Sequence, residues 1–335
     1  MFVRLHHRLA PAVNHGRTCL ARPLSTHAGS PLATHATPLR SPRAAHPRER
    51  VRLLLDAAAA GIAATVAAAA ALGLSAAPEV ATCEPSVEAQ SLKGKVALVT
   101  GATGSIGWAV AQQLADAGCH VALVDLNEER CQEFASQLPT RSIGIAFDVS
   151  NEPAVVDGVK RVSAALGGVD ILVNVAGILS NNKAFETSAD EWRKVHAVNY
   201  DSSFYLSKAC MPHMVERGWG RVVNLSSWAY KSGGLTAGTA YSASKAAMVG
   251  LTFSLARQFA GAGVTVNAVA PCYVFSPMIM EQLTAEKRGE LLEMIPVKRF
   301  CKPEEVAHAV MFLVSPLSGF ITGEVVDMNG GFQMD

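Results

Sequence analysis

The chain has little charge, few aromatic residues and no paired cysteine motif. Charged residues make up 17% of its 335 residues and aromatic residues 6%, whereas 50% are hydrophobic. This composition excludes a disordered chain and is sufficient for a full hydrophobic core. The net charge of +1 gives no reason to expect a nucleic-acid partner. The seven cysteines include no C-x-x-C pair, which argues against a zinc site or a disulfide framework and indicates a reducing compartment.

Acidic residues and lysine are absent from residues 1–48, which contain seven arginines. Because the whole chain carries +1 and this segment +7, the remainder carries −6. An arginine-rich, hydroxyl-bearing and acid-free start is typical of an organelle transit peptide. We therefore predict a disordered transit peptide over residues 1–50. A mitochondrial address is favoured over a plastid one, because residues 22–26 resemble a mitochondrial processing site; a tail without a targeting role is the alternative.

Residues 57–78 contain no charged side chain and are long enough to cross a bilayer as a helix. Thirteen of residues 57–77 are alanine, however, and larger aliphatic side chains supply most of the insertion energy. Three interpretations of residues 51–78 stay open: a weak membrane anchor, the hydrophobic half of a two-part targeting signal, or an alanine-rich helix packed on protein. We expect residues 79–92 to be a polar linker.

From residue 93 onward, short aliphatic runs alternate with amphipathic stretches. The runs predict buried parallel strands at residues 96–100, 120–124, 142–147, 171–175, 221–225, 264–269 and 324–328. Helical patterns lie between them, at residues 106–117, 128–137, 154–166, 189–217, 240–260 and 304–314. This alternation predicts an α/β fold with a Rossmann-type, doubly wound, seven-stranded parallel sheet, in one catalytic domain over residues 93–335.

A glycine-rich turn lies between the first predicted strand and the helix that follows. Gly101, Gly104 and Gly107 allow a tight turn and a close approach of the backbone to a pyrophosphate, which free N–H groups at the helix start can bind. Asp125 ends the next strand, where a carboxylate accepts both ribose hydroxyls of an adenosine and repels a 2′-phosphate. The pattern therefore favours NAD(H) over NADP(H). The alternative is that the glycines form an ordinary loop and the aspartate caps a helix, with no role in cofactor binding.

Tyr241 and Lys245 are four residues apart in a predicted helix and therefore share a face. A lysine ammonium near the hydroxyl, together with a positive nicotinamide ring, would lower the tyrosine pKa toward neutrality. Such a tyrosine can take a proton from an alcohol or return one to a carbonyl. Ser227 follows the predicted strand at 221–225, at the sheet edge where open α/β sheets bind ligands.

Motifs in order along residues 93–332 resemble those of the classical short-chain dehydrogenases/reductases, most of all the 3-oxoacyl-acyl-carrier-protein reductases and their NAD-dependent relatives. The motifs lie at residues 100–107, 148–149, 174–177, 198–199, 223–227, 241–245, 266–271, 303–307, 321–324 and 329–331. The resemblance implies an oxidoreductase that interconverts a secondary alcohol and a ketone, with 3-oxoacyl or 3-hydroxyacyl compounds among the candidate substrates. It also implies a homotetramer.

A non-catalytic NAD-binding subunit of an organelle membrane complex is the alternative function. Family members of that kind generally lose the tyrosine or the lysine, whereas this chain keeps both, so the resemblance favours an enzyme.

The resemblance also assigns roles to individual positions. Tyr241 would be the acid/base, Lys245 would lower its pKa and bind the nicotinamide ribose, and Ser227 would orient the substrate oxygen. Asn199 would hold a water that links Lys245 to solvent. The cofactor positions would be Gly101, Gly104, Ser105, Ile106, Gly107 and Asp125, then Asp148 and Val149 beside the adenine, Asn174, Ala176 and Gly177 in the cleft, and Pro271, Val274 and Ser276 near the nicotinamide.

The chain departs from the family pattern in ways that bear on the substrate. Gly104 and Ser105 exchange the usual order in the glycine-rich turn, and Cys272 stands where the family has glycine. The interval from Ser227 to Tyr241 is one residue longer than usual, which predicts a bulge in residues 228–234. Substrate choice should lie in that loop and in residues 277–296, a methionine-rich segment suited to a mobile lid or to core packing. Candidates for an apolar pocket are Leu179, Trp228 and Tyr230.

Overall fold

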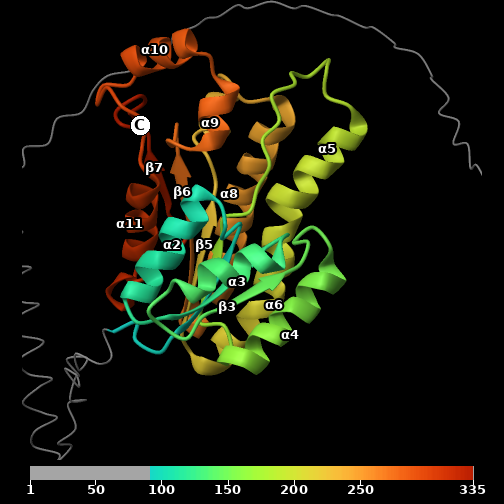
Figure 1. The fold of residues 1–335 in the computed structure, drawn as a ribbon, viewed down its shortest axis with the longest axis vertical. Helices are drawn as coiled ribbons and strands as arrows, with labels where there is room; N and C mark the ends of the chain where they lie inside the picture. The colour runs from blue at the N-terminus through green and yellow to red at the C-terminus, as the bar shows by residue number, and fades with distance from the viewer. Residues whose placement is uncertain (1–90, 335) are drawn as a thin grey trace, which may run out of the picture. The chain divides into compact units, whose positions relative to one another are not determined.

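The computed structural model describes residues 91–334, apart from the side chains of Met278 and Gln282. The predictions for residues 1–50 and 51–78, and that for the linker up to residue 90, lie outside this range. Within it, seven strands form one parallel sheet in the order β3-β2-β1-β4-β5-β6-β7 (Figure 1). This sheet confirms the predicted fold class. The strands are β1 (Val96–Thr100), β2 (His120–Asp125), β3 (Ile143–Ala146), β4 (Ile171–Asn174), β5 (Gly220–Leu225), β6 (Val264–Pro271) and β7 (Val325–Met328).

Helices cover both faces of the sheet. Residues of α2, α3 and α11 belong to the hydrophobic cluster on one face, and residues of α4, α6 and α8 to the cluster on the other. The α-helices are α2 (Ser105–Asp116), α3 (Glu128–Ser136), α4 (Glu152–Leu166), α5 (Ala189–His196), α6 (Ser202–Arg217), α7 (Ala229–Ser232), α8 (Thr239–Phe259), α9 (Pro277–Gln282), α10 (Ala285–Met294) and α11 (Pro303–Val314). Shorter turns are η2 (Ala197–Asp201), η3 (Ala260–Ala262) and η4 (Pro316–Ser318). No helix within residues 91–334 is both long and apolar enough to span a membrane.

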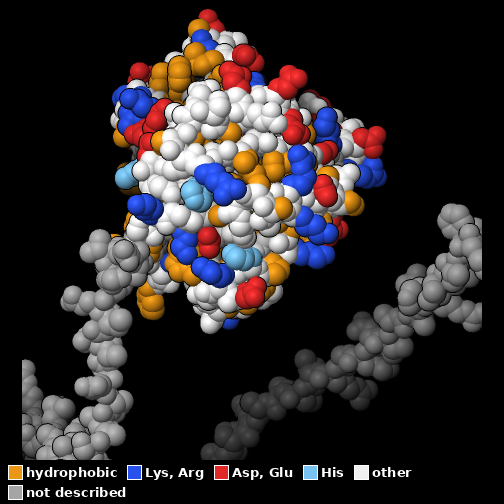
Figure 2. All heavy atoms as spheres, turned by 60° about the horizontal axis from the view of Figure 1, so that its bottom comes forward, with side chains coloured by type: hydrophobic (Ala, Val, Ile, Leu, Met, Phe, Trp, Pro, Cys, Tyr) orange, Lys and Arg blue, Asp and Glu red, His pale blue; other side chains and the backbone are white. Residues whose placement is uncertain are grey.

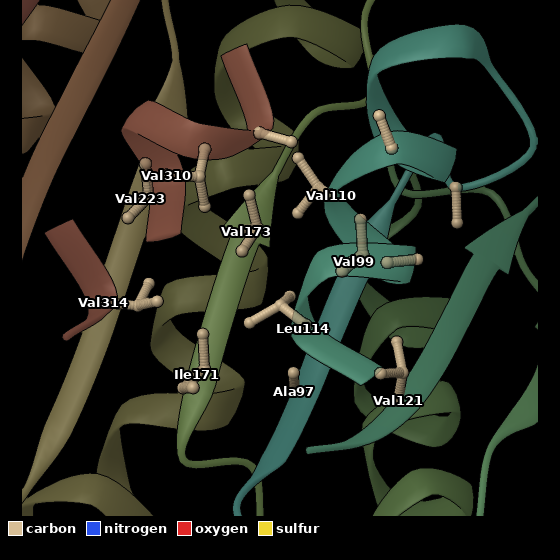
Figure 3. Close-up of a cluster of buried hydrophobic side chains, with 14 of the residues drawn as sticks. Ala97, Val99, Val110, Leu114, Val121, Ile171, Val173, Val223, Val310 and Val314 are labelled. Atoms are coloured by element: carbon tan, nitrogen blue, oxygen red, sulfur yellow. The ribbon is translucent and has the colours of Figure 1, made fainter. Parts of the chain in front are cut away.

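The first hydrophobic cluster joins the centre of the sheet to two helices. Figure 3 shows Val110 and Leu114 of α2 and Val310 and Val314 of α11 among side chains of β1, β4 and β5. All four of these helical side chains are at most 1% exposed. A buried aliphatic side chain contributes about 1.5–3 kcal/mol through removal of apolar surface from water. This packing fixes α2, and with it the glycine-rich turn at its start, against β1.

The predicted helix over residues 189–217 is interrupted. It consists of α5 and α6 joined by the π-turn η2, which contains Asn199. The pattern alone does not reveal this insertion, because a single π-turn leaves the helix axis continuous and only shifts the side chains by one position. The shift leaves Asn199 fully buried.

Aromatic and charged side chains meet near the amino ends of β1 and β5. Trp219 has the ammonium of Lys95 4.2 Å from its ring centroid and the guanidinium of Arg221 4.6 Å from it. Asp170 accepts the Val96 N–H at 3.0 Å and lies 3.7 Å from the Lys95 ammonium. Figure 2 turns the bottom of Figure 1 forward and shows a surface where basic, acidic and apolar side chains are mixed.

Candidate active site

A cavity of about 1190 Å³ opens at the carboxyl ends of the strands. Small-molecule sites usually occupy roughly 300–1,000 Å³, so this one has room for a dinucleotide together with a substrate. Sixteen of the eighteen predicted site residues line it: Gly101, Gly104, Ser105, Ile106, Gly107, Asp125, Asp148, Val149, Ala176, Gly177, Ser227, Tyr241, Lys245, Pro271, Val274 and Ser276. Among the residues that the structure describes, no group of His, Cys, Asp and Glu could hold a metal ion.

The glycine-rich turn fits a closely approaching pyrophosphate. Gly101 has a positive φ of 60°, and a Cβ on Gly107 would lie 2.2 Å from the Gly101 carbonyl oxygen, so neither position accepts a side chain without strain. Gly104 is the N-cap of α2 and provides no side-chain cap for the first helical N–H groups. These N–H groups belong to Ser105, Ile106 and Gly107, which line the cavity. The turn therefore provides both the space and the donors that a phosphate needs.

Asp125 lies at the carboxyl end of β2 and is bound to the same turn. Its Oδ2 accepts the Thr103 N–H at 3.1 Å and the Thr103 hydroxyl at 2.7 Å, and its Oδ1 accepts the Leu126 N–H at 2.9 Å. Arg130 lies on the other side of Thr103, with Nη2 3.5 Å from the Thr103 carbonyl, and also lines the cavity. The sequence motif did not identify Thr103 or Arg130, because their importance comes from the contact between the turn and β2.

Tyr241, Lys245 and Ser227 meet deeper in the cavity. Tyr241 and Lys245 lie in the first turns of α8, and the Lys245 ammonium is 5.7 Å from the Tyr241 ring centroid. Ser227 follows β5 and hydrogen-bonds to the Tyr241 side chain. The Ser227 hydroxyl oxygen also accepts the Ala229 N–H at 3.2 Å. The structure thus places these three predicted residues together.

Burial changes the proton affinity of both groups on α8. It raises the pKa of Tyr241 above its usual value, and the hydrogen bond with Ser227 offsets part of this rise. It lowers the pKa of Lys245 to about 8, because a buried ammonium loses its hydration. The lowered tyrosine pKa predicted above is therefore not provided by the chain alone, and it would depend on the positive charge of a nicotinamide ring.

Asn199 lies beneath the cavity and does not line it. Its side-chain amide donates to the Ile178 carbonyl at 2.9 Å and to the Ser244 hydroxyl at 3.1 Å, and its oxygen accepts the Ile178 N–H at 2.7 Å. A Cβ on Gly177 would lie 3.3 Å from Asn199 Oδ1 and 3.5 Å from Lys245 Nζ. The asparagine and the lysine therefore both face Gly177.

Asn174 does not line the cofactor cleft, contrary to the prediction. It ends β4, is 2% exposed and pairs in register with Asn224 of β5. Its side-chain amide donates to Asn224 Oδ1 at 2.8 Å, and Asn224 in turn donates to the Thr252 hydroxyl at 2.9 Å. The sequence did not show this pairing, because it depends on which strands are neighbours in the sheet.

The substrate end of the cavity includes two of the three predicted apolar residues. Leu179 and Trp228 line it, whereas Tyr230 does not. Trp228 precedes the single-turn helix α7, and Tyr230 lies within that helix. The Tyr230 side chain lies near Lys231 and Asp327 instead of the cavity. This short helix occupies the loop where a bulge was predicted.

The carboxyl-terminal tail also reaches this end. Trp228 Nε1 donates to Gln333 Oε1 at 2.9 Å, and its ring packs edge-on against Phe332 with 4.7 Å between centroids.

The predicted lid over residues 277–296 consists of α9 and α10, and Ile279 and Leu283 from this region line the cavity.

Known proteins resemble this chain over the region that builds the cavity. A family model described as enoyl-(acyl carrier protein) reductase matches residues 101–333. The 3-oxoacyl-[acyl-carrier-protein] reductase of Vibrio cholerae is 40% identical over 245 residues, which cover 73% of this chain and 99% of the relative. The corresponding reductase of Aquifex aeolicus is 37% identical over 244 residues, with 72% and 98% covered. Nodulation protein G of Azospirillum brasilense is 39% identical over 243 residues, with 71% and 97% covered.

Solved structures show the same fold. A putative gluconate dehydrogenase from Agrobacterium tumefaciens superposes with a TM-score of 0.70 at 28% identity, and a putative short-chain alcohol dehydrogenase from Sinorhizobium meliloti with 0.69 at 33%. Each comparison covers 72% of this chain and 97% of the other. The chain therefore belongs to the short-chain dehydrogenase/reductase family, as an NAD(P)-dependent oxidoreductase that acts on CH–OH or keto groups and is similar to the 3-oxoacyl-acyl-carrier-protein reductases.

Proposed function

We propose that this protein interconverts a secondary alcohol and a ketone with NAD(H), and that Tyr241 is the acid/base. The observation that carries the proposal is the meeting of Tyr241, Ser227 and Lys245 in the same cavity as the glycine-rich turn. A bound nicotinamide supplies or accepts the hydride. The chain holds the substrate and moves the proton.

In the proposed mechanism, the Tyr241 hydroxyl gives its proton to the oxygen of a ketone, or its phenolate takes one from an alcohol. The Ser227 hydroxyl lies beside Tyr241 in the cavity, where it would orient that oxygen by a hydrogen bond. The Lys245 ammonium stabilises the phenolate through its positive charge. Asn199 fixes the Ile178 backbone through two hydrogen bonds. We propose that it also holds the water through which Lys245 exchanges protons with solvent.

The preference for NAD(H) rests on Asp125. Its carboxylate lies beside the glycine-rich turn, where it would accept the ribose hydroxyls and repel a 2′-phosphate. Arg130 is near enough to attract a phosphate, so the cofactor preference is set by the balance between the two side chains.

For the substrate, we propose a 3-oxoacyl or 3-hydroxyacyl compound. Leu179, Trp228, Ile279 and Leu283 give the substrate end of the cavity an apolar wall. The reductases of Vibrio cholerae and Aquifex aeolicus are named for 3-oxoacyl substrates, which supports this class. The reductases of Vibrio cholerae and Aquifex aeolicus and the two solved dehydrogenases are named as enzymes, and they give no support to a non-catalytic subunit.

The test is a substrate panel with the purified full chain, followed through the absorbance of NADH and NADPH. The panel contains a 3-oxoacyl thioester, an enoyl thioester, a 3-hydroxy acid, a polyol and a steroid alcohol. We expect the oxoacyl compound to be reduced with NADH, and Tyr241→Phe to abolish turnover while NADH still binds. Tyr205→Phe, in α6 and outside the cavity, is the control and should retain full activity. A wild-type rate in Tyr241→Phe would refute the proposed acid/base.

We also propose a mitochondrial location and a homotetramer. The arginine-rich residues 1–48 support import into an organelle, with the plastid as the other destination. Sequencing the amino terminus of the protein isolated from its organelle tests the role of residues 57–77. A start near residue 25 would support retention of a weak anchor, and a start near residue 78 would support a second targeting signal. Sedimentation of the purified protein tests the tetramer.

A further inference from the structure

Two loops at the substrate end of the cavity are joined by backbone hydrogen bonds. One loop runs from β4 to α5, and the other from β5 to α8. The Gly238 N–H donates to the Ser180 carbonyl at 2.6 Å, and the Thr239 N–H to the Asn182 carbonyl at 3.0 Å. A Cβ on Gly238 would lie 2.5 Å from the Asn182 carbonyl oxygen, so the contact depends on glycine at this position.

A single lysine completes this contact. The Lys183 ammonium donates to the Gly234 carbonyl at 2.8 Å and to the Ala237 carbonyl at 2.6 Å. It therefore holds both ends of the segment 234–237 at one point. Hydrogen bonds from a charged donor are roughly twice as strong as those between neutral groups. Without the ammonium, these two carbonyls would need other donors, such as water.

The held segment forms part of the cavity wall. Leu235 and Thr236, the residues between the two carbonyls, both line the cavity. Gly233 and Gly234 precede them with positive φ values of 69° and 81°, a conformation that glycine adopts without strain. Tyr241 follows the segment by four residues. The position of the ammonium therefore affects the wall of the cavity, whereas Tyr241 itself is held within the helix α8.

The β4–α5 loop is itself anchored to α5. Glu191 accepts the Ser180 hydroxyl at 2.5 Å and the Asn182 side-chain amide at 2.8 Å. The Ser188 hydroxyl caps the same helix by accepting the Glu191 N–H at 3.1 Å. The lysine thus projects from a loop that α5 holds in place.

We propose that Lys183 is a positioning residue that fixes the shape of the substrate end of the cavity by holding segment 234–237. The proposal rests on the oxidoreductase function proposed above. It assigns to Lys183 the placement of Leu235 and Thr236 against the substrate, and no role in hydride or proton transfer. Loss of the ammonium should therefore weaken substrate binding and leave cofactor binding intact.

The kinetic test compares Lys183→Met with Lys183→Arg in the full chain. For the oxoacyl thioester we expect Lys183→Met to raise KM about tenfold, the scale of one charge-assisted hydrogen bond, and to change kcat and the Kd for NADH by less than about twofold. Lys183→Arg retains a donor to both carbonyls and should recover most of the affinity. Lys160→Met, at an exposed position on α4 outside the cavity, is the matched control and should match the wild type. An unchanged KM in Lys183→Met would overturn the proposal.

A second measurement needs no turnover. The Gly238 and Thr239 amides donate across the loop contact, so their hydrogen exchange reports its opening. We expect exchange at these amides to accelerate about tenfold in Lys183→Met and to stay at the wild-type rate in Lys160→Met. Unchanged exchange would overturn the proposal even if activity fell. Faster exchange in a protein whose wild type reduces no ketone would support the lysine's role in holding the loop while refuting the proposed function.

Discussion

The Lys245 ammonium donates a 2.7 Å hydrogen bond to the carbonyl oxygen of Leu225, the last residue of β5. The lysine is 3% exposed, and burial lowers its pKa from 10.5 to about 8. The carbonyl is a neutral acceptor and compensates only part of the hydration that the ammonium loses. Burying the charged Lys245 ammonium, which the proposed chemistry needs, therefore lowers the free energy of unfolding.

This cost predicts a pH dependence of the free energy of unfolding. Below about pH 8 the lysine is protonated in both states and contributes no slope. Between about pH 8 and 10.5 the unfolded chain binds more protons than the folded one, so the free energy of unfolding rises with pH. The shift corresponds to about 3 kcal/mol. Lys245→Met removes this contribution, so wild type should gain about that amount over the variant between pH 7.5 and 10.5, as measured by urea denaturation. A constant difference across this range would contradict the lowered pKa.

The cofactor preference can be changed at Asp125. Asp125→Ala removes the charge that would repel a 2′-phosphate and leaves Arg130 nearby. We expect the ratio of kcat/KM for NADPH to that for NADH to rise about tenfold, which corresponds to about 1.4 kcal/mol of electrostatic discrimination. Steady-state rates with each cofactor measure this ratio.

A control variant distinguishes loss of the Asp125 charge from disturbance of the glycine-rich turn. Thr103→Val removes the hydroxyl that donates to Asp125 Oδ2 at 2.7 Å but keeps the carboxylate. It should weaken both cofactors equally and leave the ratio unchanged. Equal efficiency of the wild type with both cofactors would remove the argument from Asp125.

Features that depend on the pattern of neighbouring residues could be predicted from the sequence. Each run of aliphatic residues became a strand of the sheet. The glycine-rich turn and the pair Tyr241 and Lys245 line one cavity because parallel strands end at a common edge.

Contacts between distant segments could not be predicted in this way. Asn174 pairs with Asn224 across 50 residues, and Lys183 reaches carbonyls 51 and 54 residues away. Neither contact leaves a periodic signal in the sequence. The π-turn around Asn199 is missed for a different reason, since it inserts one residue into a pattern that still reads as a helix.

The carboxyl-terminal tail should affect substrate binding through Trp228. Phe332→Ala removes an edge-on aromatic contact, which contributes about 0.5–1.5 kcal/mol beyond area burial. Because Trp228 lines the cavity, we expect KM for the ketone to rise by about threefold to tenfold with the Kd for NADH unchanged. Met334→Ala, at a side chain that is 85% exposed, is the control. Equal KM values in the two variants would show that the tail does not support this wall.

Gly107 is the position in the glycine-rich turn with the least space. A Cβ there would lie 2.2 Å from the Gly101 carbonyl oxygen and 2.8 Å from the Ala102 Cα, both backbone atoms that cannot move as a flexible side chain can. Gly107→Ala must therefore displace the start of α2 and the N–H groups proposed to hold the pyrophosphate. We expect the Kd for NADH to rise by at least about tenfold, measured by the fluorescence of bound NADH. Gly261→Ala, which has open space and no positive φ, should bind NADH as the wild type does. Normal NADH binding by Gly107→Ala would mean that the cofactor does not depend on the close packing of this turn.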